Sequence, residues 1–91
     1  MSVIVRIPTQ LRELTAGEGT IDLDATTVRE AISALDVLHP GIGERLLDDD
    51  GQLRRFVNLF LADEDVRFLD GLDTPIAAGQ TLSVVPAVAG G

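Results

Sequence analysis

The sequence lacks both cysteine and lysine, and each absence removes a class of chemistry. Without cysteine, the 91 residues can form no disulfide, no thiolate nucleophile and no Cys-ligated zinc site. All seven basic residues are arginine, so no side chain offers an amine for Schiff-base catalysis or an isopeptide bond. No apolar run approaches the ~20 residues of a membrane span, and the first residues do not resemble a signal peptide. We therefore expect a cytoplasmic protein.

Aromatic residues and positive charge are also scarce. Three phenylalanines are the only aromatics, so aliphatic side chains must fill the core. Fifteen acidic residues give a formal net charge of −8. An acidic surface repels phosphate backbones and anionic lipids, which makes nucleic acid and membranes poor partners and favours a basic protein partner. The length suits one domain.

The first third of the chain predicts a hairpin followed by a helix. Val3, Val5 and Ile7 alternate with other residues as in a strand, and residues 20–23 form a plausible antiparallel second strand. Thr27 and Glu30 have the spacing of a capping box. The apolar stripe that follows predicts an amphipathic helix that ends before Pro40.

The remaining residues predict strands. After a possible helical turn at 42–47, we expect a strand at 55–62, an acidic turn at 63–65, a short strand at 66–68 and a last strand at 81–85. This order predicts an α+β fold: a mixed sheet of about five strands with one main helix packed on one face. Such a sheet can hold its first and last strands side by side.

No group of side chains predicts catalysis. The acidic runs 48–50 and 63–65 lack the spacing of a calcium loop, so we interpret them as solvated turns and expect no metal site. His39 has no Ser, Cys or second His to complete a catalytic set. We expect a protein that is not an enzyme and that binds no cofactor of its own.

The last residues carry a resemblance to a known family. Residues 79–91 read GQTLSVVPAVAGG: a turn glycine, an alternating strand, a proline, a short uncharged run and Gly-Gly. This pattern resembles the closing motif of the prokaryotic ubiquitin-like sulfur carriers (MoaD/ThiS-like), which have a β-grasp fold. Residues 44–46, 55–58 and 63–68 look most like the actinobacterial CysO-type branch. Gln80 departs from the family, which usually has Asp after the turn glycine.

The resemblance implies a β-grasp domain at 1–86 and a flexible tail at 87–91. In such carriers an E1-like enzyme uses ATP to adenylate the terminal carboxylate, here that of Gly91, and a sulfur donor converts it to a thiocarboxylate. The sulfur then goes to a biosynthetic enzyme, such as a PLP-dependent cysteine synthase or a thiazole synthase, and a metalloprotease can process the tail. The residues expected to thread into the partner are Pro86, Ala87, Val88, Ala89 and Gly90.

The tail residues suit that role physically. Glycine has no Cβ, so Gly90 and Gly91 can enter a narrow tunnel and leave the last carbonyl unhindered. Five extended residues after Pro86 reach at most ~17 Å. The uncharged side chains avoid burying an unpaired charge.

The sequence predicts one docking surface and leaves four candidate functions open. Alternation along the strands predicts one set of residues that faces the helix: Val3, Val5, Ile7, Val57, Leu59, Leu61, Leu82 and Val84. A second set then faces away and predicts a docking patch for the activating enzyme: Ile4, Phe56, Phe60 and Val85. Besides a sulfur carrier, the chain fits a modifier conjugated to target lysines through Gly91, or a small subunit of a molybdopterin-synthase-like complex. A plain interaction module with an inert tail is the remaining alternative.

Overall fold

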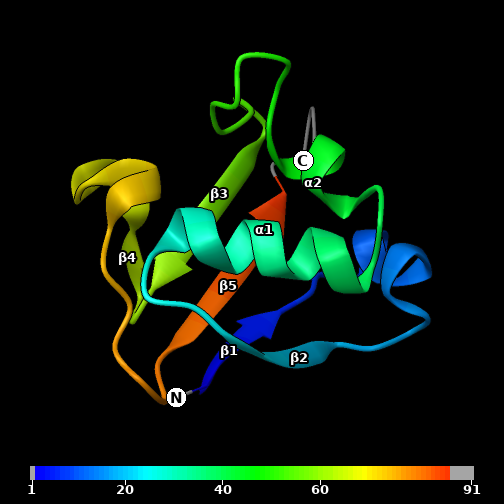
Figure 1. Cartoon of the computed structure of the whole chain (residues 1–91). Coiled ribbons are helices and arrows are strands. Elements are labelled where there is room, and N and C mark those ends of the chain that lie inside the picture. The colour runs from blue at the N-terminus through cyan, green and yellow to red at the C-terminus, as the bar shows by residue number, and fades with distance from the viewer. Residues whose placement is uncertain (1, 87–91) are drawn as a thin grey trace.

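The computed structural model describes residues 2–86, which form a mixed five-stranded sheet covered on one face by a helix (Figure 1). The strands are β1 (Ser2–Arg6), β2 (Thr20–Asp24), β3 (Val57–Leu61), β4 (Glu64–Asp65) and β5 (Thr81–Pro86). They lie in the order β2-β1-β5-β3-β4. β1 and β5 are parallel neighbours at the centre, and the other pairs are antiparallel. This is the mixed sheet that the element order predicts, in the β-grasp arrangement that the family resemblance implies.

The helices are α1 (Val28–Leu38) and the short α2 (Ile42–Leu46), with 3-10 turns at Thr9–Thr15, Val66–Phe68 and Gly71–Asp73. α1 crosses the sheet in Figure 1. Its start matches the expected cap, because the Thr27 hydroxyl accepts a hydrogen bond from the Glu30 N–H at 3.2 Å. The Glu30 carboxylate reaches one residue further back than a standard capping box, to the backbone N–H and hydroxyl of Thr26. The hydroxyl contact, followed by the backbone contact, lowers the pKa of the Glu30 carboxyl.

The core lies between α1 and the sheet. The strand residues predicted to face the helix are all buried: Val3, Val5, Ile7, Val57, Leu59, Leu61, Leu82 and Val84. From α1 the buried stripe is Val28, Ala31, Ile32 and Leu35, within the same apolar cluster. Each fully buried aliphatic side chain of this kind stabilises the fold by about 1.5–3 kcal/mol. The alternation along the strands therefore predicted the buried face correctly.

The hairpin after β3 differs from the sequence prediction. The tight turn falls on Ala62 and Asp63, whose φ angles are 50° and 70°, so the turn comes one residue earlier than expected. Glu64–Asp65 then forms β4, and residues 66–68 form a 3-10 turn, not the predicted strand. The cause is Asp65, whose side chain accepts a hydrogen bond from the Arg67 N–H at 2.8 Å and caps that turn.

β3 also begins later than expected, at Val57. The Val57 N–H donates to the Arg54 carbonyl at 3.1 Å, so residues 54–57 turn before the chain enters the sheet. Before β5, Gly79 has a φ of 82°, a conformation that favours glycine, and the Gln80 side chain accepts a hydrogen bond from the Ala77 N–H. A glutamine can therefore close the turn at the position where the family usually has aspartate.

Candidate functional site

β5 ends as a strand with only one neighbour in the sheet. On one side it pairs with β1 from Thr81 to Ser83, where Arg6 is the last partner. On the other side it pairs with β3 as far as Pro86, which lies opposite Val57. Among the described residues, 2–86, the last three of β5 therefore pair with β3 alone, and no strand in this range pairs with their other edge.

Pro86 fits this position. A proline has no N–H to donate, so it is tolerated in a sheet where a strand edge is free. Its pairing with Val57 places the start of the tail in the middle of the sheet at one end of the domain (Figure 1). The predicted tail residues Ala87, Val88, Ala89, Gly90 and Gly91 lie outside the described residues, so their role stays a prediction. Their anchor is described, and it is a hydrogen-bonded strand.

The structure places three residues of the predicted docking patch on one sheet face and the fourth in a turn. Ile4, Phe60 and Val85 belong to three adjacent strands and share the sheet face opposite α1, because each alternates with buried residues. Val85 is 42% exposed, while Ile4 and Phe60 are half-buried. Phe56 lies in the turn before β3, so the strand alternation that predicted its direction does not apply to it. It is 64% exposed, next to the residue that pairs with Pro86. That this surface docks a partner stays a prediction.

Polar contacts beside Val85 were not found from the sequence. Asn58 lies opposite Val85 on β3, and its side-chain oxygen accepts a hydrogen bond from Arg67 at 2.9 Å. A second nitrogen of Arg67 donates to the carbonyl of Arg54 at 2.7 Å. The two hydrogen bonds fix the position of the Arg67 guanidinium. Because both acceptors are neutral, they do not neutralise its positive charge. The 3-10 turn that aims Arg67 back at β3 has no simple pattern in the sequence.

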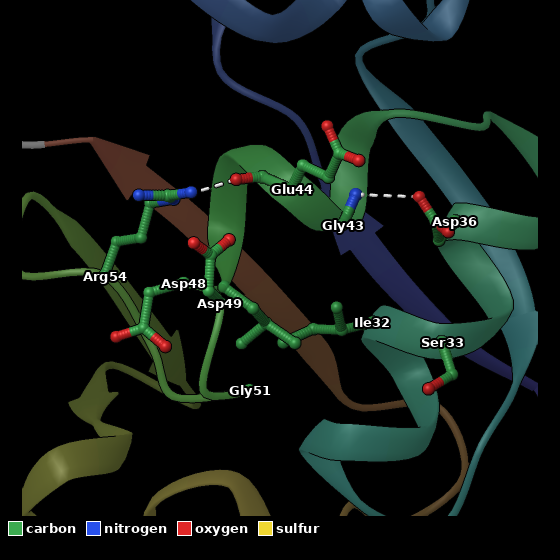
Figure 2. Close-up of a pocket in the computed structure, with 10 residues that line it drawn as sticks. Ile32, Ser33, Asp36, Gly43, Glu44, Asp48, Asp49, Gly51 and Arg54 are labelled. Atoms are coloured by element: carbon green, nitrogen blue, oxygen red, sulfur yellow. Dashed lines mark hydrogen bonds between the residues drawn. The ribbon is translucent and has the colours of Figure 1, made fainter.

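The hollow between α1, α2 and the loop after α2 is lined by side chains that connect these elements (Figure 2). The Asp36 carboxylate accepts hydrogen bonds from the N–H groups of Gly41 and Gly43, which joins the two helices. Arg54 donates from Nε to the carbonyl of Glu44 at 2.8 Å. These groups are used in structural contacts, and they include no nucleophile paired with a general base.

Residues 2–86 contain neither a candidate metal-binding cluster nor a candidate membrane-spanning helix. No group of three or more His, Cys, Asp or Glu side chains in this part of the chain could hold a metal ion. None of its helices has the length and hydrophobicity needed to cross a bilayer.

Comparisons with known proteins match the whole chain. The family model described as "ThiS family" matches residues 5–91. The sulfur carrier protein CysO of Mycobacterium tuberculosis is 47% identical over 93 residues, covering 100% of both chains. The CysO chain in the crystal structure of the Amycolatopsis orientalis BexX/CysO complex superimposes with a TM-score of 0.92 and 45% identity, covering 98% of this chain and 99% of that one. Small archaeal modifier protein 1 of Haloferax volcanii gives a TM-score of 0.81 with 30% identity, covering 96% and 98%. The chain belongs to the ThiS family of ubiquitin-like β-grasp proteins.

Proposed function

We propose that this protein is a sulfur carrier whose Gly91 cycles between carboxylate, acyl-adenylate and thiocarboxylate. The observation that carries the proposal is the full-length similarity, 47% identical, to a protein named sulfur carrier protein CysO. The family match extends through the Gly-Gly motif to residue 91. Both the domain and the tail are thus part of the resemblance.

The proposed chemistry has two steps, both on the Gly91 carbonyl. In the first, a carboxylate oxygen attacks the α-phosphorus of ATP, forms the acyl-adenylate and releases pyrophosphate. In the second, a sulfur donor attacks the carbonyl carbon, the C–O bond to AMP breaks, and a thiocarboxylate remains. An E1-like partner would bind the ATP and present the sulfur, so the carrier itself needs no bound cofactor.

The described part of the chain supports this role because it holds the base of the tail in a fixed position, here called a mount. β5 is a central strand, and its pairing with β3 up to Pro86 fixes the direction in which the tail leaves the domain. A stiff mount reduces the conformational entropy that is lost when the tail docks. The relatives named sulfur carrier proteins support a co-substrate that acts with partner enzymes.

We propose the acceptor of the sulfur from the branch of the family. Similarity to CysO proteins favours a PLP-dependent synthase that makes cysteine, followed by a metalloprotease that regenerates the Gly-Gly end. A thiazole synthase or another sulfur-using enzyme is an alternative acceptor, because related carriers share this fold.

A second function, protein modification, is favoured by the similarity to small archaeal modifier protein 1. In that case Gly91 would form isopeptide bonds with lysines of target proteins. Because this chain has no lysine, it could be attached to targets but could not form lysine-linked chains.

Intact mass spectrometry separates the two functions. The purified protein is incubated with the E1-like enzyme, ATP and a sulfide source, and then with a cell extract. Replacement of one oxygen by sulfur supports the carrier, and covalent adducts on other proteins support the modifier. An unchanged mass, with pyrophosphate release confirming that the enzyme is active on a control carrier, would refute both.

A further inference from the structure

A hollow borders the free edge of β5, where the strand has lost β1 as a neighbour. We call it the exit hollow. Its polar lining comes from Arg6, Arg12 and Thr20, and β5 contributes residues 83–85; the other lining residues are Ile7, Pro8 and Gly19. It therefore lies directly beside the residues that lead into the tail.

Arg12 is held in this hollow by two contacts. Its Nε donates a hydrogen bond to the carbonyl of Ile7 at 3.1 Å. Its guanidinium also packs over Gly19, where an added Cβ would lie 3.1 Å from Nη2 and 3.2 Å from Cζ. The absence of a side chain at Gly19 leaves the space that the guanidinium occupies. Sequence reasoning missed this contact because it depends on the 3-10 turn between β1 and β2.

Arg6 supplies a second positive charge on the same hollow. It is exposed on the sheet face opposite α1, in register with Ser83. Within residues 2–86 neither Arg6 nor Arg12 forms an ion pair, whereas Arg29 pairs with Asp73 at 3.4 Å in another part of the molecule. In a protein with a net charge of −8, two arginines without acidic partners thus converge beside the exit of the tail.

We infer that the exit hollow receives a carboxylate side chain from the partner enzyme, at the rim of the active site that takes the tail. A guanidinium with free Nη donors matches a carboxylate in shape and charge. Pro8 and Val85 offer apolar surface to the methylene stem of such a side chain. The strongly acidic protein disfavours a free polyanion such as a nucleotide, while a carboxylate on a docking protein is brought there by the rest of the interface. The inference rests on the proposed function.

Single and double variants test it with the E1-like enzyme, by pyrophosphate release at varied carrier concentration. We expect Arg6→Gln with Arg12→Gln to lower kcat/KM about tenfold, through KM for the carrier. The effect should shrink at high salt, because screening weakens exposed charge pairs. Arg29→Gln is the control for each single variant: like Arg6→Gln or Arg12→Gln it removes one positive charge, but away from the hollow, and it should have little effect.

Two further variants separate the effect of the position of a guanidinium from the effect of its charge. Gly19→Ala keeps every charge but places a Cβ 3.1 Å from Arg12 Nη2, so the guanidinium must shift by a few tenths of an ångström and part of the loss seen in Arg12→Gln should appear. Arg6→Lys should retain most of the wild-type rate, since it keeps the positive charge. Thermal melting of each variant shows whether the fold is intact.

The outcomes distinguish the inference from the function on which it rests. If the wild-type protein is not adenylated, the proposed function fails. If it is adenylated and the Arg6 and Arg12 variants match Arg29→Gln, the inference is overturned. A loss that falls on KM for ATP would also overturn it, because the hollow would then contact the nucleotide.

Discussion

Shortening the tail tests whether β5 fixes the point from which the tail reaches the partner. Pro86 is anchored opposite Val57, so the distance that Gly91 can reach is set by the five residues that follow. Fully extended, they reach at most ~17 Å from Pro86. Deleting Ala87 and Val88 removes about 7 Å of this reach. Since misplacing a reacting group by about 1 Å can cost 100-fold in rate, we expect thiocarboxylate formation to fall at least 100-fold.

The assay is single-turnover formation of the thiocarboxylate, followed by intact mass spectrometry. The matched control replaces Ala87 and Val88 with two glycines, which keeps the length and should keep most of the activity. Melting temperatures of both variants should equal that of the wild type, because β5 remains paired up to Pro86. If the shortened protein accepts sulfur at nearly the normal rate, β5 does not fix the reach and the reasoning is refuted.

Four further predictions address the tail, the core, the cap of α1 and the sheet face opposite α1. Gly90→Val should abolish sulfur transfer without changing the melting temperature; a variant that unfolds instead would show that the tail is structural. Leu59→Ala, at a fully buried position, should lower the free energy of unfolding by about 2–5 kcal/mol in urea titrations, and a loss below 1 kcal/mol would contradict the packing described. The lowered pKa of Glu30 stabilises the folded state above the unfolded-state pKa, so the stability advantage over Glu30→Gln should vanish as pH falls through the folded-state pKa. An advantage that stays undiminished while the pH falls far enough to protonate the carboxyl would refute this assignment. Phe60→Ala should weaken binding of the activating enzyme by roughly 1–2 kcal/mol in calorimetry, whereas Phe68→Ala, exposed on another element, should not; equal effects would refute the docking patch.

The sequence predicted the sheet and helix well because their signals are local and periodic. Alternation in the strands identified the buried face, and the spacing of Thr27 and Glu30 marked the start of α1. The element order also allowed β1 and β5 to lie side by side, as they do. These features need no knowledge of distant contacts.

The errors lie where a single hydrogen bond decides the local structure. The alternating pattern of Val66, Arg67 and Phe68 suggested a strand, but the Asp65 side chain caps a 3-10 turn there. In the same way, the turn before Val57 shortens β3 and removes Phe56 from the strand.

The arginines around the tail were beyond the reach of sequence reasoning. Arg12 reaches the edge of β5 only because a 3-10 turn brings it over Gly19. Arg6 lies on a strand that the element order allowed beside the last one, but nothing in the sequence placed its side chain near that of Arg12. A tertiary contact between an arginine and a glycine seven positions apart has no distinctive pattern.

The most direct test of the account locates the sulfur within the chain. After reaction with the E1-like enzyme, ATP and sulfide, cleavage after Arg67 releases a peptide that begins at Phe68 and includes Gly91. Tandem mass spectrometry of this peptide should place the single sulfur-for-oxygen exchange on Gly91. Sulfur on any other residue, or a peptide that stays unmodified while pyrophosphate is released, would contradict the claim that Gly91 carries the sulfur.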